Sequence, residues 1–119
     1  ENIFDGIVSG IEGSRVDIRL GTGYLSLYPD NLNRLVVNQE ISIAIRPEYV
    51  KLADSQDKNC LTAELIDGKE ELSFYSYTFQ FQEGTNIKVH ISKSAGPGLE
   101  NGNTYRLYLP SENLVILGE

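Results

Sequence analysis

The residues of this chain that can carry out chemistry are few and far apart in the sequence. It contains one histidine, His90, and one cysteine, Cys60. One of each cannot complete the four-ligand set of a structural zinc site, and no Asp-rich calcium loop is present. Alternation places His90 on the polar face of its predicted strand, which favours a solvated histidine over a catalytic one. We therefore expect no catalytic residue, no metal and no cofactor.

Hydrolysis of ATP would require a loop of the form G-x-x-x-x-G-K-[ST], which cradles phosphates and positions magnesium. The only Gly-Lys pair, Gly68-Lys69, is followed by Glu70 and lacks both the upstream glycine and the hydroxyl. The chain is therefore predicted not to be an enzyme. Cys60 has no second cysteine with which to form an internal disulfide, so we interpret it as an inert thiol in a reducing compartment.

Composition narrows the choice of partners. Ten Lys and Arg residues stand against seventeen Asp and Glu residues, and the net charge of −7 repels nucleic acid and anionic lipid. No apolar run approaches the roughly 20 residues of a membrane-spanning helix. The chain begins at Glu1 and contains no methionine, so we expect it to be a domain from a larger protein.

Apolar residues alternate in short runs separated by turn residues, which predicts an all-β fold of antiparallel strands. A small barrel of the OB type, or two such barrels, is the favoured architecture, with a β-sandwich as the alternative. The polar segment 53–59, ADSQDKN, is predicted to link two halves, 1–53 and 60–119. The predicted strands are 3–11, 15–20, 24–28, 41–46, 60–66, 72–82, 85–92, 105–109 and 114–117, with turns at 12–14, 21–23, 67–68 and 83–84.

The segment 41–52, ISIAIRPEYVKL, is the most distinctive pattern in the chain. An alternating strand runs into Pro47, which lacks a backbone donor and ends ladder pairing. Arg46 and Glu48 lie on the same side if the chain stays extended across the proline. They are predicted to form an exposed ion pair or fix the strand corner, with a contact to a partner domain as the alternative.

Three stretches resemble the TOBE domain, the accessory β domain of ATP-binding subunits of bacterial ABC importers. They are Asn2-Ile3-Phe4 with Gly6, then Arg46-Pro47-Glu48, and finally the tail from Gly102 through 105–117. The NIF form is most similar to the spermidine/putrescine-type branch. The resemblance implies an OB-like regulatory and dimer-contact domain without catalytic residues of its own.

The same resemblance implies the partners and the location. The partners would be the ATPase core of the same chain, a second copy of the subunit and, indirectly, the membrane subunits of the transporter. The location would be cytoplasmic and peripheral at the inner membrane face, without direct insertion. The parent subunit is expected to be an ATPase.

Two other features have alternative functional interpretations. The aromatic row Tyr75, Tyr77, Phe79 and Phe81 shares one face of a strand and is predicted to fill a core, with a protein interface or stacked bases as alternatives. The glycine-containing loop 94–103, with Lys93 beside it, offers a possible nest for an oxyanion. A small oxyanion-binding or ligand-binding β module is therefore the alternative function, and nucleic-acid binding ranks third.

Overall fold

The computed structural model describes residues 1–30, 32, 34–96 and 98–117. This part of the chain forms strands joined by tight turns and short 3-10 helices, so the predicted all-β fold class is confirmed. The strands are β1 (Asn2–Glu12), β2 (Arg15–Leu20), β3 (Gly23–Leu27), β4 (Glu40–Ile45), β5 (Lys51–Leu52), β6 (Cys60–Glu70), β7 (Phe74–Gln82), β8 (Thr85–Ser92), β9 (Thr104–Tyr108) and β10 (Val115–Leu117), and the 3-10 helices are η1 (Pro47–Tyr49), η2 (Lys93–Ala95) and η3 (Ser111–Asn113).

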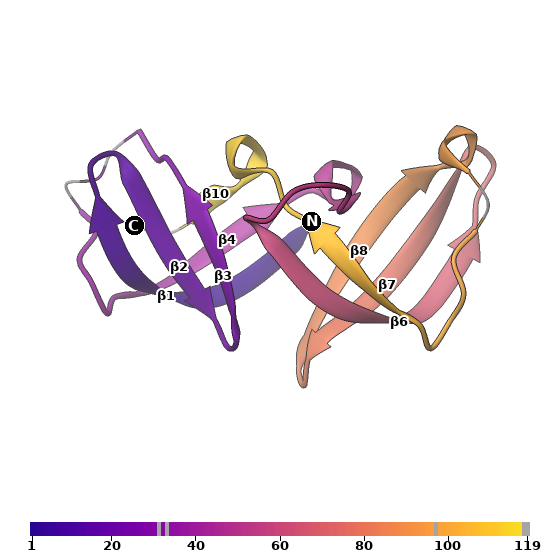
Figure 1. Ribbon diagram of the computed structural model, residues 1–119, viewed down its shortest axis with the longest axis horizontal. Coiled ribbons are helices and arrows are strands. Elements are labelled where there is room, and N and C mark those ends of the chain that lie inside the picture. The colour runs from indigo at the N-terminus through magenta and orange to yellow at the C-terminus, as the bar shows by residue number, and fades with distance from the viewer. Residues whose placement is uncertain (31, 33, 97, 118–119) are drawn as a thin grey trace.

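The strands form two five-stranded antiparallel sheets that lie side by side along the long axis of the molecule (Figure 1). Their strand orders are β10-β4-β1-β2-β3 and β5-β9-β6-β7-β8. If β6 is placed on β1, these orders become identical, with β7 on β2, β8 on β3 and β9 on β4. The chain is therefore a structural repeat, which the sequence reading did not detect.

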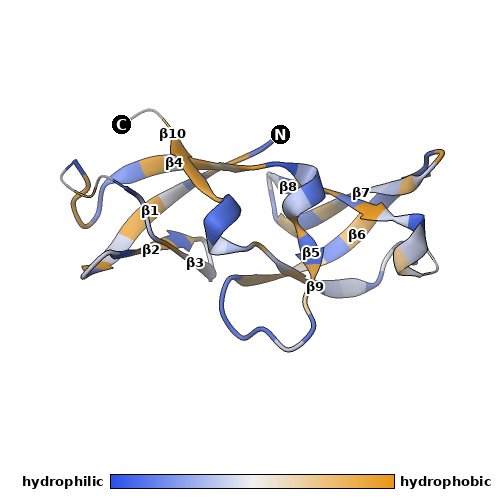
Figure 2. Cartoon of the chain, turned by 90° about the horizontal axis from the view of Figure 1, so that it is seen from above, coloured by the Kyte–Doolittle hydropathy of each residue, from blue (hydrophilic) through white to orange (hydrophobic). Residues whose placement is uncertain are grey.

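The two halves of the repeat exchange their last strands. After β4 and η1 the chain enters β5, which pairs with β9 of the second sheet rather than with β4. After β9 and η3 it enters β10, which pairs with β4 of the first sheet. The loop 53–59 connects the halves and is hydrophilic over most of its length (Figure 2). Because each sheet contains a strand from the other half, neither sheet is complete without the whole chain.

Equivalent loops dock on equivalent bulges in β1 and β6. The pairing register shifts between Val8 and Gly10 in β1 and between Leu65 and Asp67 in β6. The amide of Val8 donates to Gln39 and its carbonyl accepts from Asn38, while Leu65 makes the same two bonds with Asn103 and Gly102. Asn38 and Gly102 both have positive φ, 74° and 87°, as expected of the residue types that tolerate left-handed backbone.

A single hydrophobic cluster joins the inward faces of both sheets. Alternation in β4 buries Ile41, Ile43 and Ile45, as predicted. In the aromatic row, Tyr77 and Phe79 are fully buried, and Tyr75 and Phe81 pack against the cluster while half-buried. The core interpretation of this row is confirmed.

Two sequence predictions about the second half were wrong. Asp67-Gly68 was expected to be a turn, but β6 continues through it to Glu70 and the two residues follow the bulge. The strand predicted for 72–82 begins only at Phe74, because the reversal occurs at 71–73, where the Glu71 amide donates to the Phe74 carbonyl at 2.9 Å. Leu72, placed in a strand by its apolar character, is a turn residue and 97% exposed.

Candidate binding site

Asn59, at the end of the polar loop, holds the two sheets together. Its side chain is 7% exposed and its backbone has a φ of 57°. The Ser26 amide in β3 donates to its Oδ1 at 2.8 Å, and its Nδ2 donates to the carbonyls of Ser26 at 2.9 Å and Leu109 at 3.0 Å. The loop was predicted to link the two halves, and its last residue is also a buried contact between the two sheets.

Asn2 makes the equivalent contact from the start of β1. Its Nδ2 donates to the Lys88 carbonyl in β8 and its Oδ1 accepts from the Lys88 amide, both at 2.8 Å. Each asparagine thus binds the backbone N–H and C=O of one residue in the edge strand of the opposite half. An amide side chain suits this position because it carries one acceptor and two donors, the complement of a backbone N–H and C=O.

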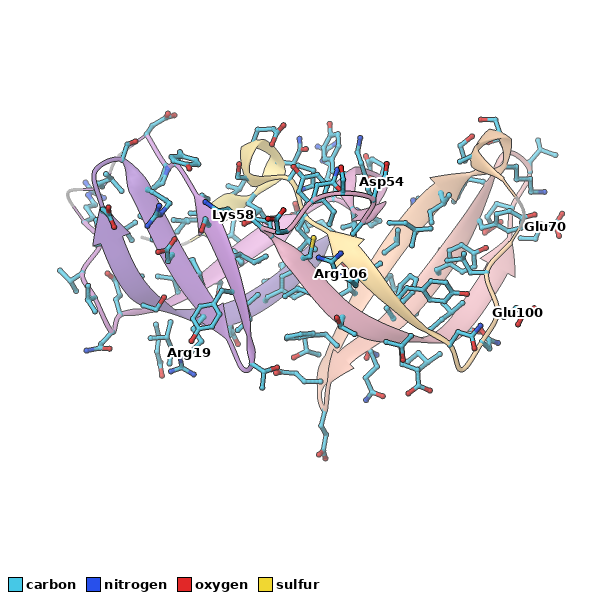
Figure 3. All side chains as sticks on the ribbon, viewed as in Figure 1. Arg19, Asp54, Lys58, Glu70, Glu100 and Arg106 are labelled. Carbon is cyan, nitrogen blue, oxygen red and sulfur yellow. The ribbon has the colours of Figure 1, made fainter. Side chains whose placement is uncertain are left out.

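A pocket of about 310 Å³ opens beside Asn59, where the two sheets meet. We call it the junction pocket, and its lining is Ser26, Tyr28, Gln56, Asp57, Lys58, Asn59, Tyr108 and Ser111. In Figure 3, Lys58, Asp54 and Arg106 lie around this junction. The Nη2 of Arg106 donates to the Gln56 carbonyl at 3.0 Å and so holds the loop that forms one wall.

Hydroxyl groups dominate the polar lining of the junction pocket. The Ser26 hydroxyl donates to the Asp17 carboxylate at 2.7 Å, so its hydrogen is already in use. Tyr28, Tyr108 and Ser111 also line the pocket, and each carries a hydroxyl group that can donate a hydrogen bond. With Lys58, these residue types can supply the donors that a small oxyanion requires, because its oxygens accept hydrogen bonds on all sides.

The larger cavities offer less to an anion. A groove of about 700 Å³ on the outer face of the first sheet contains Arg19, but also the carboxylates of Asp5 and Glu40. A pocket of about 390 Å³ lies between η1, β5 and the loop after β8. It contains Lys51 and His90 together with the carboxylate of Glu48, but its hydroxyls are only those of Tyr77 and Ser92, and its apolar lining includes Val50, Leu52, Ile91 and Leu99. The junction pocket combines a cation with several hydroxyls and only one carboxylate, Asp57.

The oxyanion nest suggested for the glycine-containing loop lacks a free cation. Lys93 Nζ donates to Glu70 Oε2 at 2.7 Å and lies 5.6 Å from the centre of the Tyr75 ring. The loop itself is held by tyrosines, because the amides of Leu99 and Glu100 donate to the hydroxyls of Tyr77 and Tyr105. Residue 97 of this loop lies outside the described residues. The positive charge expected to attract an anion is thus neutralised by Glu70.

Arg46 and Glu48 come together as an exposed pair. Their nearest charged atoms are 3.9 Å apart across Pro47, and the side chains are 66% and 51% exposed. This is the geometry of the ion-pair interpretation, and both groups remain accessible to solvent. A contact of the pair with a partner domain stays a prediction.

The single histidine and cysteine do not form a site with other ligands. His90 is half-buried and packs against Phe74, with 4.8 Å between the ring centroids. Cys60 is a free thiol, and its Sγ lies 3.4 Å from the Gln56 carbonyl oxygen. Among the residues that the structure describes, no three His, Cys, Asp or Glu side chains gather in a way that could hold a metal ion. The helices described are all too short to cross a membrane.

The sequence reading did not find the junction pocket. Its residues come from β3, the 53–59 loop, β9 and η3, which are far apart in the sequence. A signal was nevertheless present, since an asparagine precedes an alternating apolar strand at both Asn2 and Asn59. That repetition indicates two equivalent halves, and a duplicated chain has a junction at which to look for a site.

Comparison with solved structures identifies a close match of fold. A crystal structure of the cytoplasmic molybdate-binding protein ModG, with molybdate bound, superposes with a TM-score of 0.85 at 23% sequence identity. The match covers 97% of this chain and 94% of that one. This likeness confirms the predicted OB-like β fold. A scan of protein-family models and a search of curated proteins found no match.

Proposed function

We propose that this chain is a non-catalytic β module that binds a small tetrahedral oxyanion in the junction pocket. The observation that carries the proposal is the lining of that pocket, where three residues that bear a hydroxyl, Tyr28, Tyr108 and Ser111, and the cationic Lys58 line about 310 Å³ of space. The fold of a protein described as molybdate-binding supports the same class of ligand. Because the net charge of −7 repels anions at long range, binding has to rest on direct hydrogen bonds within the pocket.

Isothermal titration calorimetry with molybdate, sulfate and phosphate tests the proposal. The key variant is Lys58→Ala, which removes the only ammonium group in the lining without removing a buried side chain. A charge-assisted hydrogen bond contributes about 1.5 kcal/mol or more, so we expect at least about tenfold weaker binding. Ser111→Ala, which removes one neutral donor, should weaken binding by about fivefold.

Lys69→Ala is the matched control. Lys69 is an exposed lysine near the end of β6, and its replacement changes the net charge by the same amount as Lys58→Ala. If Lys69→Ala weakens binding as much as Lys58→Ala, the effect is one of overall charge and the pocket assignment is wrong. Absence of measurable heat with all three anions at millimolar concentration would refute the proposed function.

A regulatory and dimer-contact role in an ABC importer ATP-binding subunit stays a prediction from the sequence resemblance. So do the spermidine/putrescine branch, the ATPase core and second subunit as partners, and the cytoplasmic location. The exposed Arg46 and Glu48 are accessible to a partner domain. Altered ATPase regulation by Arg46→Ala in the parent subunit would support this role, and unaltered regulation would remove its main structural candidate.

A further inference from the structure

The pocket of about 390 Å³ lies where the two edge strands of the second sheet approach each other, and we call it the seam pocket. β5 and β8 stand at opposite ends of the strand order of that sheet. Lys51 and Leu52 of β5 and His90 and Ile91 of β8 all line the pocket. Its volume falls within the range of about 300 to 1,000 Å³ that is common for small-molecule sites.

The repeat places an equivalent pocket of about 420 Å³ in the first half, between η3, β10 and the residues that follow β3. Pairing register makes Lys51 equivalent to Val115 of β10, and His90 equivalent to Tyr28. Val115 and Tyr28 both line the pocket of the first half. That pocket therefore shows which residue types this fold accepts at such a seam.

The two equivalent pockets differ in charge. Among the described residues that line it, the pocket of the first half has two carboxylates, Asp30 and Glu112, and no Lys, Arg or His. The seam pocket has Lys51 and His90 with a single carboxylate, Glu48. Because the first half adopts the same strand order without a cation at this place, the fold does not require Lys51 and His90 there. Their presence indicates a negatively charged ligand.

Polar groups of the seam pocket are available to such a ligand. Glu48 lies 3.9 Å from Arg46, which offsets its charge. Lys51 is exposed and takes part in no salt bridge within the described part of the chain. Tyr77 is buried, and its hydroxyl accepts a hydrogen bond from the Leu99 amide at 2.8 Å. Both of these residues line the pocket, and a tyrosine hydroxyl that accepts one bond can still donate another.

The other walls of the seam pocket are apolar. Val50 is buried, and Ile91 and Leu99 are partly buried and pack against the hydrophobic cluster. Such walls favour a ligand with an apolar body, because binding removes its apolar surface from water. A bare tetrahedral oxyanion gains nothing from them, whereas the carboxylate of a larger molecule can accept charge-assisted hydrogen bonds from Lys51 and His90.

We propose that the seam pocket binds a small carboxylic acid with an aromatic or branched apolar body. The site is independent of the proposed oxyanion site, because the seam pocket and the junction pocket share no lining residue.

Titration of the ¹⁵N-labelled chain with phenylacetate, followed by two-dimensional NMR, tests this proposal. We expect a Kd below about 1 mM, with shifts at the amides of Val50, Lys51 and Leu99. Phenylacetamide has the same body without the charge and should bind at least about fivefold more weakly. Acetate keeps the charge but lacks the ring, and should bind at least about tenfold more weakly.

Lys51→Val is the main variant, because Val115 shows that the fold accepts valine at the equivalent position. It should weaken phenylacetate binding about tenfold and change phenylacetamide binding by less than about twofold. Lys69→Val is the matched control, since it removes the same charge from an exposed lysine of β6 outside the lining. It should leave the binding of both ligands within about twofold.

Four results would overturn the proposal. One is the absence of amide shifts with phenylacetate at about 10 mM. Another is equal weakening by Lys51→Val and Lys69→Val, since the effect would then be one of overall charge. A third is binding of phenylacetamide as tight as that of phenylacetate. The fourth is displacement of phenylacetate by molybdate with shifts at Ser26, Lys58 and Tyr108, which would place the carboxylate in the junction pocket.

Discussion

Substitutions of Asn59 separate two contributions to stability. One is the set of side-chain hydrogen bonds that join the two sheets, and the other is the conformation of its backbone. Its side chain makes three hydrogen bonds, at 2.8, 2.9 and 3.0 Å, to the backbone of β3 and to Leu109. Its backbone φ of 57° is also one that most residue types adopt only with strain. Replacement by glycine removes the hydrogen bonds and keeps the backbone relaxed, whereas replacement by alanine removes the bonds and adds the strain.

The expected losses follow from these contacts. Each buried hydrogen bond contributes about 1 kcal/mol net, so Asn59→Gly should lower the free energy of unfolding by about 3 kcal/mol. Asn59→Ala should cost about 1 kcal/mol more, because a Cβ is unfavourable in left-handed backbone. Asn2→Ala, which loses two hydrogen bonds, should cost about 2 kcal/mol.

Urea denaturation followed by circular dichroism measures all three losses. A single hydrophobic cluster joins the sheets, so we expect one cooperative transition whose midpoint falls by about 1 to 3 M for Asn59→Gly. The reasoning would be refuted if Asn59→Gly lost less than about 1 kcal/mol. It would also be refuted if the alanine variant were the more stable of the two, since the positive φ would then impose no strain.

Three further predictions concern other parts of the fold. A Cβ at Gly6 would lie 2.6 Å from a buried side chain of β2, so Gly6→Ala should lower the free energy of unfolding by about 1 to 3 kcal/mol in a urea titration. A Cβ at Gly10 would have its nearest neighbour 3.7 Å away, so Gly10→Ala should lower it by less than about 0.5 kcal/mol. Tyr77→Phe removes the 2.8 Å bond from the Leu99 amide, and hydrogen exchange at that amide should become about fivefold faster or more. Arg46→Ala breaks only an exposed ion pair and should change thermal stability by less than about 0.5 kcal/mol; a larger loss would mean that the arginine has a structural role.

Local patterns were sufficient to predict most of the strands. The alternation in β4 places three isoleucines on one face of the strand, because side-chain direction has a period of two in any extended segment. Their apolar character then predicts that this face is the buried one. Pro47 ends that strand for an equally local reason, since it lacks a backbone donor. The same period of two placed the aromatic row of β7 on one face, and the net charge of −7 with no Lys or Arg between Leu72 and Gln82 favoured a core over stacked bases.

Where two structures satisfy the same local pattern, sequence reasoning chose wrongly. The dipeptide Asp67-Gly68 suits a tight turn, but it suits the positions after a β-bulge equally well. The choice between them depends on pairing with β7 and on the bonds that Leu65 makes with Gly102 and Asn103. Leu72 reads as a strand residue by hydropathy, yet the reversal of the chain leaves it in solvent.

The sequence alone determined that this chain is all-β, where most of its strands lie and which side chains of β4 and β7 face inward. These conclusions depend on residue type and on spacing over a few positions. The tertiary structure alone decided that β5 and β10 exchange sheets, that Asn59 is buried, that Lys93 is neutralised by Glu70 and that Ser111, Tyr108 and Lys58 line one pocket. These features join residues far apart in the chain, and their partners are fixed by long-range strand pairing and packing, which a local pattern does not encode.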